Sequence, residues 1–230
     1  MSELENLSTK LIAAAFAEAE LRGWRGLNIP MLARKAGLTM AEAYRVAPDM
    51  ETLLDVYAAR IDAAVAQELA REQPAGEWRE SVFDALMMRC DAMLKDREAL
   101  RVIAIDESRS LIGLPRAGAR ARRSMQRMLE AAGLGDDPLA TRALALALVP
   151  LYARILKVWF ADAPDQAKTM AALDKGLRRM ERWRARAGAL WSRFGRRAEP
   201  DGETDIEIEA NGEPAGAESV AEVPAAETKH

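Results

Sequence analysis

The chain has 230 residues, half of them hydrophobic and 5% aromatic, with a formal net charge of −3. This length and apolar content are enough for one or two domains with a buried core. The single cysteine, Cys90, excludes an internal disulfide framework and a cysteine-rich metal site, and the only histidine, His230, excludes a histidine-based catalytic site. The sequence shows no signal peptide and no uncharged apolar run long enough to span a membrane. We therefore expect a cytoplasmic protein that is not an enzyme and needs no cofactor or metal.

Helices are expected throughout, because alanine is abundant and β-branched runs are scarce. Residues 1–7 are expected to be frayed, and apolar residues at helical spacing predict a first helix from Ser8 to about Arg22. A short helix over residues 29–36 follows, because Asn28 is a favourable N-cap residue. Gly37 is expected to end that helix.

A second short helix is predicted over residues 40–46, because Thr39 and Glu42 have the spacing of a capping box. Pro48 prevents this helix from continuing, and Asp49 is placed to cap a longer third one. Two short helices joined by a glycine-containing turn are typical of a helix-turn-helix, whose second helix can enter the major groove of DNA.

This stretch resembles the signature of TetR-type repressors, A-x-x-A-G-(V)-(S)-x-x-x-(L)-Y-x-x-F-x-x-K-E-x-L-L. The matching residues are Ala33, Ala36, Gly37, Tyr44, Pro48, Glu51, Leu53 and Leu54, and the upstream residues Leu11, Ile12, Gly23 and Trp24 resemble the family's first helix and its end. The resemblance implies an all-α, TetR-like fold with three parts. These are a helix-turn-helix head over residues 1–50, a helical effector-binding and dimerisation body over residues 51–197, and a disordered acidic tail over residues 198–230.

In the resembling family the head binds double-stranded DNA. The resemblance assigns DNA contacts to Asn28, Lys35, Thr39, Met40, Ala41, Tyr44 and Arg45. Several positions depart from the family. Glu42 stands where threonine is usual, Val46 and Ala47 stand where His-Phe or Tyr-Phe is usual, and Met50 stands where a phosphate-binding lysine is usual. Basic and acidic residues are also equal in number over residues 1–50. Because phosphate neutralisation supplies most non-specific affinity, we expect weaker and less salt-dependent DNA binding than the family norm.

Further helices are predicted in the body from apolar periodicity and turn residues. Their approximate ranges are 50–71, 78–95, 98–111, 115–132 and 139–160, with a last helix opening at 163–165. The resemblance implies a cavity for a small apolar effector and a homodimer formed through the last two helices. The cavity is expected to be lined by Phe83, Met87, Leu111, Met128, Tyr152 and Trp159.

Charged residues of the body are interpreted as structural. Arg116, Arg120, Arg123 and Arg127 form a basic stripe along one helix face, which is expected to be solvated and to pair with nearby acids. The neighbouring carboxylates of Asp106 and Glu107 diverge on a helix, and Asp136 or Asp137 caps the helix that follows. Neither carboxylate pair is expected to be functional.

The C-terminal segment over residues 175–197 is basic and amphipathic. Its candidate contact residues are Trp183, Arg186, Trp191, Arg193 and Phe194. Three interpretations stay open for it, namely packing in a dimer interface, contact with an anionic membrane surface, and contact with nucleic acid. The acidic tail from Glu199 is expected to be disordered and to screen these arginines.

The leading hypothesis is a dimeric TetR-like transcriptional regulator that binds DNA under the control of a small apolar effector. The alternative is a TetR-fold lipid-binding or membrane-associated accessory protein, similar to those of ubiquinone biosynthesis, that no longer binds DNA. The neutral head and the basic helix with its tryptophans favour the alternative. Gly37, Tyr44, Pro48 and Glu51 favour the regulator.

Overall fold

The computed structural model describes the backbone of residues 2–72 and 77–195, and their side chains except those of residue 72 and residues 183–195. All regular structure in these ranges is helical, which confirms the predicted all-α class. The helices are α1 (Glu3–Arg22), α2 (Ile29–Ala36), α3 (Met40–Val46), α4 (Met50–Glu72), α5 (Trp78–Ala92), the 3-10 helix η1 (Leu94–Asp96), α6 (Arg97–Ser108), α7 (Gly113–Ala131), α8 (Pro138–Trp159) and α9 (Ala167–Gly195). The chain divides into two units, Met1–Ala187 and Gly188–His230, and α1 to α8 belong to the first.

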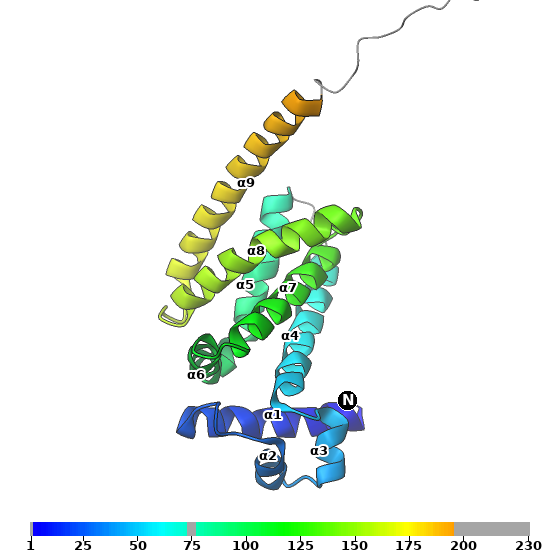
Figure 1. The fold of residues 1–230 in the computed structure, drawn as a ribbon, viewed down its shortest axis with the longest axis vertical. Coiled ribbons are helices and arrows are strands. Elements are labelled where there is room, and N and C mark those ends of the chain that lie inside the picture. Colours follow the sequence, from blue (N-terminus) through cyan, green and yellow to red (C-terminus); the bar gives the residue numbers. More distant parts are fainter. Residues whose placement is uncertain (1, 73–76, 196–230) are drawn as a thin grey trace, which may run out of the picture. The chain divides into compact units, whose positions relative to one another are not determined.

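The helices α1, α2 and α3 lie together at one end of the first unit, and α4 leads away from them toward the other helices (Figure 1). Asn28 caps α2 by accepting the backbone N–H of Met31 at 3.0 Å, and Gly37 ends α2 in the left-handed conformation with φ of 66°. The Thr39–Glu42 capping box opens α3. Both short helices have the bounds that the sequence predicted, because local capping residues set their ends.

The first helix begins earlier than predicted. The Ser2 hydroxyl accepts the N–H of Glu5, and the Glu5 carboxylate accepts the N–H of Ser2 at 2.6 Å, so a second capping box starts α1 at Glu3. The expectation of frayed residues 1–7 is therefore wrong for residues 3–7. Leu7 at this end is buried and joins the core of the first three helices.

The core of the first unit is continuous from the head to the body. In the head it includes Leu11, Trp24 and Leu32, and an edge-on contact between the rings of Phe16 and Tyr57 carries it into α4. In the body α7 packs against both α4 and α8. The largest fully buried side chains there are Leu69, Leu86, Met125, Leu129, Leu148, Ile155, Trp159, Leu173 and Leu177. Each such burial stabilises the fold by roughly 1.5–3 kcal/mol.

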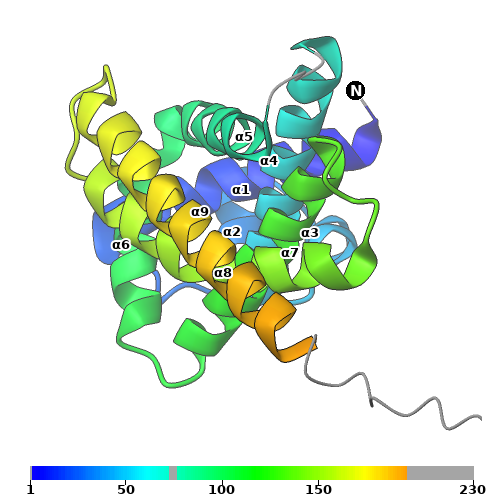
Figure 2. The same ribbon diagram turned by 90° about the horizontal axis from the view of Figure 1, so that it is seen from above.

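The last helix crosses α8, as Figure 2 shows. At the crossing Gly176 lies against Leu151, and a Cβ atom placed on Gly176 would be 2.3 Å from Leu151 Cδ1. The start of α9 differs from the prediction, since residues 163–165 lie in a turn and the helix begins at Ala167. The reason is a capping arrangement, in which the Asp162 carboxylate accepts the N–H of Thr169 at 2.7 Å.

Candidate DNA-binding head and ligand cavity

The face of α3 that a helix-turn-helix presents to DNA is open to solvent. Met40, Ala41, Tyr44 and Arg45 are exposed, as is the cap residue Thr39, and Tyr44 exposes half of its surface. The inward face of α3 carries Ala43 and Val46, which are buried against the core. The short helix is therefore oriented by two apolar side chains, so that its polar residues face outward.

Three basic side chains of the head, those of Arg22, Lys35 and Arg45, are paired with its own carboxylates. Lys35 Nζ lies 3.0 Å from Glu18 Oε1, and Arg22 binds the other oxygen of this buried carboxylate. Arg45 lies 3.3 Å from Glu3, with both side chains largely exposed. An exposed pair of this kind is worth about 0–1 kcal/mol, so a phosphate could displace Glu3 from Arg45 at little cost.

Two other residues near this face serve as helix caps. The Glu42 carboxylate accepts the N–H of Thr39 at 2.7 Å, and this backbone hydrogen bond holds the pKa of Glu42 below its usual value. The side chain of Asn28 is occupied in the same way at the start of α2. The structure thus explains the departure at Glu42, since the carboxylate closes the capping box.

A cavity of about 270 Å³ lies in the body between α4, α5, α6, α7 and α8. Its apolar walls are formed by Leu54, Ala58, Met93, Leu100, Ile103, Ala104, Leu114, Ala117, Ala121, Val149, Ala153, Leu156 and Phe160. Small side chains on one face of α7, including Gly118, leave the space open. Leu114 is exposed at the start of α7 and marks the side on which the cavity meets solvent.

A buried polar network forms one wall of the cavity. The guanidinium of Arg89 donates to the Tyr152 hydroxyl at 3.0 Å and is ion-paired with Asp62. The Asp62 carboxylate also accepts the Ser124 hydroxyl and Arg127 Nη1, both at 3.0 Å. Arg89, Ser124 and Tyr152 line the cavity, and the charge of Arg89 is matched by Asp62 within the protein.

A second polar cluster lies where the cavity meets α4. Arg120, which lines the cavity, donates to Glu107 at 3.1 Å, to Asp55 at 2.9 Å and to Glu51 at 2.9 Å. Arg123 binds the other oxygen of Asp55. Burial raises the pKa of Glu107, and the Arg120 guanidinium opposes that rise. The predicted arginine stripe thus pairs with acids as expected, but the Arg120 side chain is only 13% exposed and lies between helices rather than being solvated.

The carboxylate next to Glu107 ties the body to the head. Asp106 Oδ2 accepts the backbone N–H of Trp24 at 2.7 Å and that of Arg25 at 3.3 Å, directly after the end of α1. Two consecutive residues at the end of α6 therefore bind the head on one side and Arg120 on the other. Both carboxylates therefore have structural partners, in keeping with the interpretation of this pair as structural.

Comparison with solved structures gives a match over most of the chain. The crystal structure of a TetR transcriptional regulator from Rhodococcus sp. RHA1 superposes with a TM-score of 0.52 and 17% sequence identity, over 76% of this chain and 96% of that chain. No family model matches the sequence, and no curated protein matches it. The fold is that of a TetR transcriptional regulator. The resemblance that the head signature indicated is thereby confirmed at the level of the fold.

The cavity of this TetR fold uses few of the residues that the sequence predicted. Tyr152 lines it, whereas Met128 and Trp159 are buried in the packed core elsewhere. Phe83 and Met87 are partly buried against that core. Leu111 follows the end of α6 at Ser108 and is 97% exposed, so its placement in a cavity is wrong.

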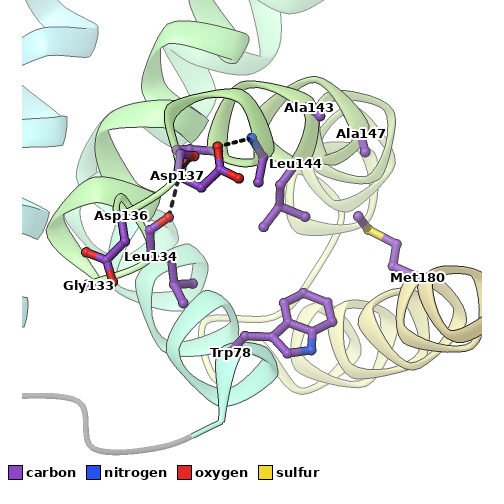
Figure 3. Close-up of a pocket in the computed structure, with 11 residues that line it drawn as sticks. Trp78, Gly133, Leu134, Asp136, Asp137, Ala143, Leu144, Ala147 and Met180 are labelled. Atoms are coloured by element: carbon purple, nitrogen blue, oxygen red, sulfur yellow. Dashed lines mark hydrogen bonds between the residues drawn. The ribbon is translucent and has the colours of Figure 1, made fainter. Parts of the chain in front are cut away.

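Another hollow lies beside the turn between α7 and α8. It is lined by Trp78, Leu134, Leu144 and Met180, with Asp136 and Asp137 at its edge (Figure 3). Asp137 confirms the predicted cap, since its carboxylate accepts the N–H groups of Leu139 at 2.9 Å and Ala140 at 3.1 Å. Its carboxylate is therefore committed to starting α8.

The exposed face of α8 carries apolar side chains, among them Leu139 and Leu146, together with the basic residues Arg142, Arg154 and Lys157. An 18-residue window of this helix has a mean hydropathy of 1.5, so the helix is long and apolar enough to cross a membrane by length and composition alone. Only 28% of the window is buried. Leu148, Ile155 and Trp159 account for the buried side, while Leu139 and Leu146 are 77% and 62% exposed. Such a patch is typical of a protein–protein interface.

The residues proposed for membrane contact lie outside the described side chains. These are Trp183, Arg186, Trp191, Arg193 and Phe194. Residues 198–230 also lie outside the described part of the chain. Within the part that is described, no cluster of histidine, cysteine, aspartate or glutamate could hold a metal ion. Cys90 is buried, and burial raises the pKa of its thiol to about 12, which makes the thiol unreactive.

Proposed function

We propose that the chain is a DNA-binding transcriptional regulator controlled by a small apolar effector. Its head would place α3 in the major groove, with Thr39, Met40, Ala41, Tyr44 and Arg45 toward the DNA. Lys35 and Asn28 would lie near the DNA phosphates, and a phosphate would replace Glu18 as the partner of Lys35. The resemblance of the head sequence and the likeness of the fold both support this proposal.

The observation that carries the effector part is the position of Arg120. Arg120 lines the cavity, and its guanidinium bonds Glu51 in the first turn of α4, the helix that follows the recognition helix α3. Asp106, adjacent to Arg120's partner Glu107, holds the end of α1. A molecule that displaces side chains in the cavity would therefore act on both connections to the head. If it binds one position of the head more tightly than another, it shifts the head toward that position.

A homodimer would complete the regulator. The exposed apolar residues of α8, Leu139 and Leu146, offer a surface for a second copy, together with Met170 on α9. A two-fold interface through these helices would set two heads in matching orientation, as a palindromic operator requires. DNA binding of this type also implies a cytoplasmic protein.

The test is selection of duplexes from a random library by the full-length chain, followed by anisotropy titration of the enriched sequence. The proposal predicts a palindromic site and an affinity that falls as salt rises. Replacement of Tyr44 and Arg45 by alanine should abolish sequence preference, whereas replacement of the exposed Leu21 by alanine should not. Uniform enrichment of all sequences would overturn the DNA-binding part.

A second candidate is a carrier of an apolar molecule that has kept the fold and lost DNA binding. The pairing of Lys35 with Glu18 and of Arg45 with Glu3 favours it, because both basic side chains are neutralised within the head. This candidate predicts ligand binding in the cavity with no selected DNA sequence. The same two measurements therefore separate the candidates.

A further inference from the structure

Every ionised group that lines the cavity is already paired inside the protein. Arg89 is paired with Asp62, and Arg120 with Glu107. A charged ligand would place an additional, unmatched charge against mainly apolar walls, and removing that charge from water is costly unless the protein supplies a partner. Because the guanidinium groups of Arg89 and Arg120 are already ion-paired with carboxylates of the protein, the cavity favours an uncharged molecule.

One hydroxyl in the cavity has a weak partner for its hydrogen. Tyr152 accepts a hydrogen bond from Arg89 Nε at 3.0 Å and directs its own hydrogen to the sulfur of Met93, 3.9 Å away. A thioether is a poor acceptor, and both residues line the cavity. A hydroxyl that accepts from a guanidinium is also polarised into a stronger donor. A ligand oxygen could therefore take this hydrogen at little cost.

The other hydroxyl groups of the lining are committed to carboxylates. Tyr57 donates to Asp96 at 2.9 Å, and Ser124 donates to Asp62 at 3.0 Å. Hydrogen bonds to an ionised acceptor are about twice as strong as neutral ones, so a ligand would not displace them readily. Tyr152 is thus the donor in this lining that is best placed to bind a ligand.

We propose that the cavity binds an uncharged, mainly apolar molecule that carries one hydrogen-bond acceptor, such as a ketone, ester or amide carbonyl, placed at Tyr152. The volume of about 270 Å³ lies just below the range of about 300–1,000 Å³ for ligand pockets, which indicates a small molecule. The inference rests on the proposed function only in taking this cavity as the ligand site, and it does not require DNA binding.

The charge preference is tested with the full-length wild-type chain and four probes of similar size. Acetophenone, ethylbenzene, phenylacetate and 2-phenylethylammonium are titrated at pH 7 and followed by ligand-observed NMR. Acetophenone should bind at least about tenfold tighter than either ion. Equal or tighter binding of an ion would overturn the inference while leaving the cavity as the ligand site. No binding of any probe would refute the cavity itself as a site for small apolar molecules.

The acceptor preference is tested with tyrosine variants. In Tyr152→Phe the affinity ratio of acetophenone to ethylbenzene should fall about fivefold, as loss of one net hydrogen bond predicts. In the matched control Tyr57→Phe the ratio should stay as in the wild type. Met93→Leu removes the competing sulfur and leaves the Arg89–Tyr152 bond, so it should keep or raise the ratio even if Tyr152→Phe folds poorly. A ratio unchanged in Tyr152→Phe, or lowered in Met93→Leu, would overturn the role of Tyr152.

Discussion

Replacement of Arg120 by methionine tests whether the charged cluster at the start of α4 holds the body together. The Arg120 and Glu107 side chains are only 13% and 10% exposed, while Glu51 and Asp55 are more open. Removal of one partner from a buried ion pair costs about 3–5 kcal/mol, and exposed pairs cost about 0–1 kcal/mol. Because this cluster is not fully enclosed, we expect Arg120→Met to lower the free energy of unfolding by about 2–4 kcal/mol.

The assay is chemical and thermal unfolding of the full-length chain at pH 7. A loss of this size should lower the melting temperature by roughly 4–16 °C for a chain of this length. The matched control is Arg116→Met, on the same helix and also paired with Glu51, but with a side chain that is 57% exposed. The control should lose less than about 1 kcal/mol.

A double replacement then identifies the cause. In Arg120→Met the Glu107 carboxylate would be buried without its cation, so adding Glu107→Gln should recover part of the lost stability. The reasoning would be refuted if Arg120→Met were as mild as Arg116→Met. It would also be refuted if Glu107→Gln brought no recovery in the Arg120→Met background.

Further predictions concern the head, the dimer and pH. Gly37→Ala should destabilise the chain by about 1 kcal/mol, because a φ of 66° is strained for alanine although the added Cβ meets no atom. The control Gly26→Ala should be neutral or mildly stabilising, and equal melting temperatures for the two variants would contradict this prediction. Asp106→Ala should cost about 1–2 kcal/mol and speed amide exchange at Trp24 and Arg25, and unchanged exchange there would exclude the proposed connection between α6 and the head. Leu146→Glu should give a monomer by light scattering with the helical content intact, while Leu21→Glu, at a residue that is 77% exposed against 62% for Leu146, should leave a dimer. A wild-type monomer at micromolar concentration would refute the dimer. The pKa of Glu107 is raised in the folded state, so its protonated form stabilises the fold fully below the unfolded pKa of about 4.3, and this stabilisation is lost as pH rises through the folded pKa. The wild type should therefore lose stability relative to Glu107→Gln over that pH range. The opposite slope would contradict the burial of Glu107.

The head was predictable from the sequence because its signals are local. Asn28, Gly37 and the Thr39–Glu42 capping box fix the bounds of α2 and α3 within a few residues of each signal. Ser2 and Glu5 carry the same kind of local signal at the start of α1. The exposed positions Tyr44 and Arg45 also followed from helical periodicity, since Ala43 and Val46 fill the buried face.

The cavity was not predictable in the same way. Which residues line it depends on how five helices pack, and apolar periodicity selects core residues such as Met128 and Trp159 as readily as lining residues. The pattern in the sequence that marks the cavity is the combination of small side chains with a charged residue on α7, around Gly118 and Arg120. The role of Asp106 depends on a hydrogen bond across 82 positions of sequence, which no local pattern reveals.

The most direct test of the regulator is the affinity of the full-length chain for its selected duplex, measured with and without acetophenone at saturating concentration. The account predicts sequence-specific binding that tightens or weakens when the cavity is filled, and a response in Tyr152→Phe that needs about fivefold more acetophenone. Binding no tighter than the non-specific range of about 10⁻⁴–10⁻⁶ M, with no selected sequence, would contradict it. That result, combined with acetophenone binding in the cavity, would identify the carrier as the correct function.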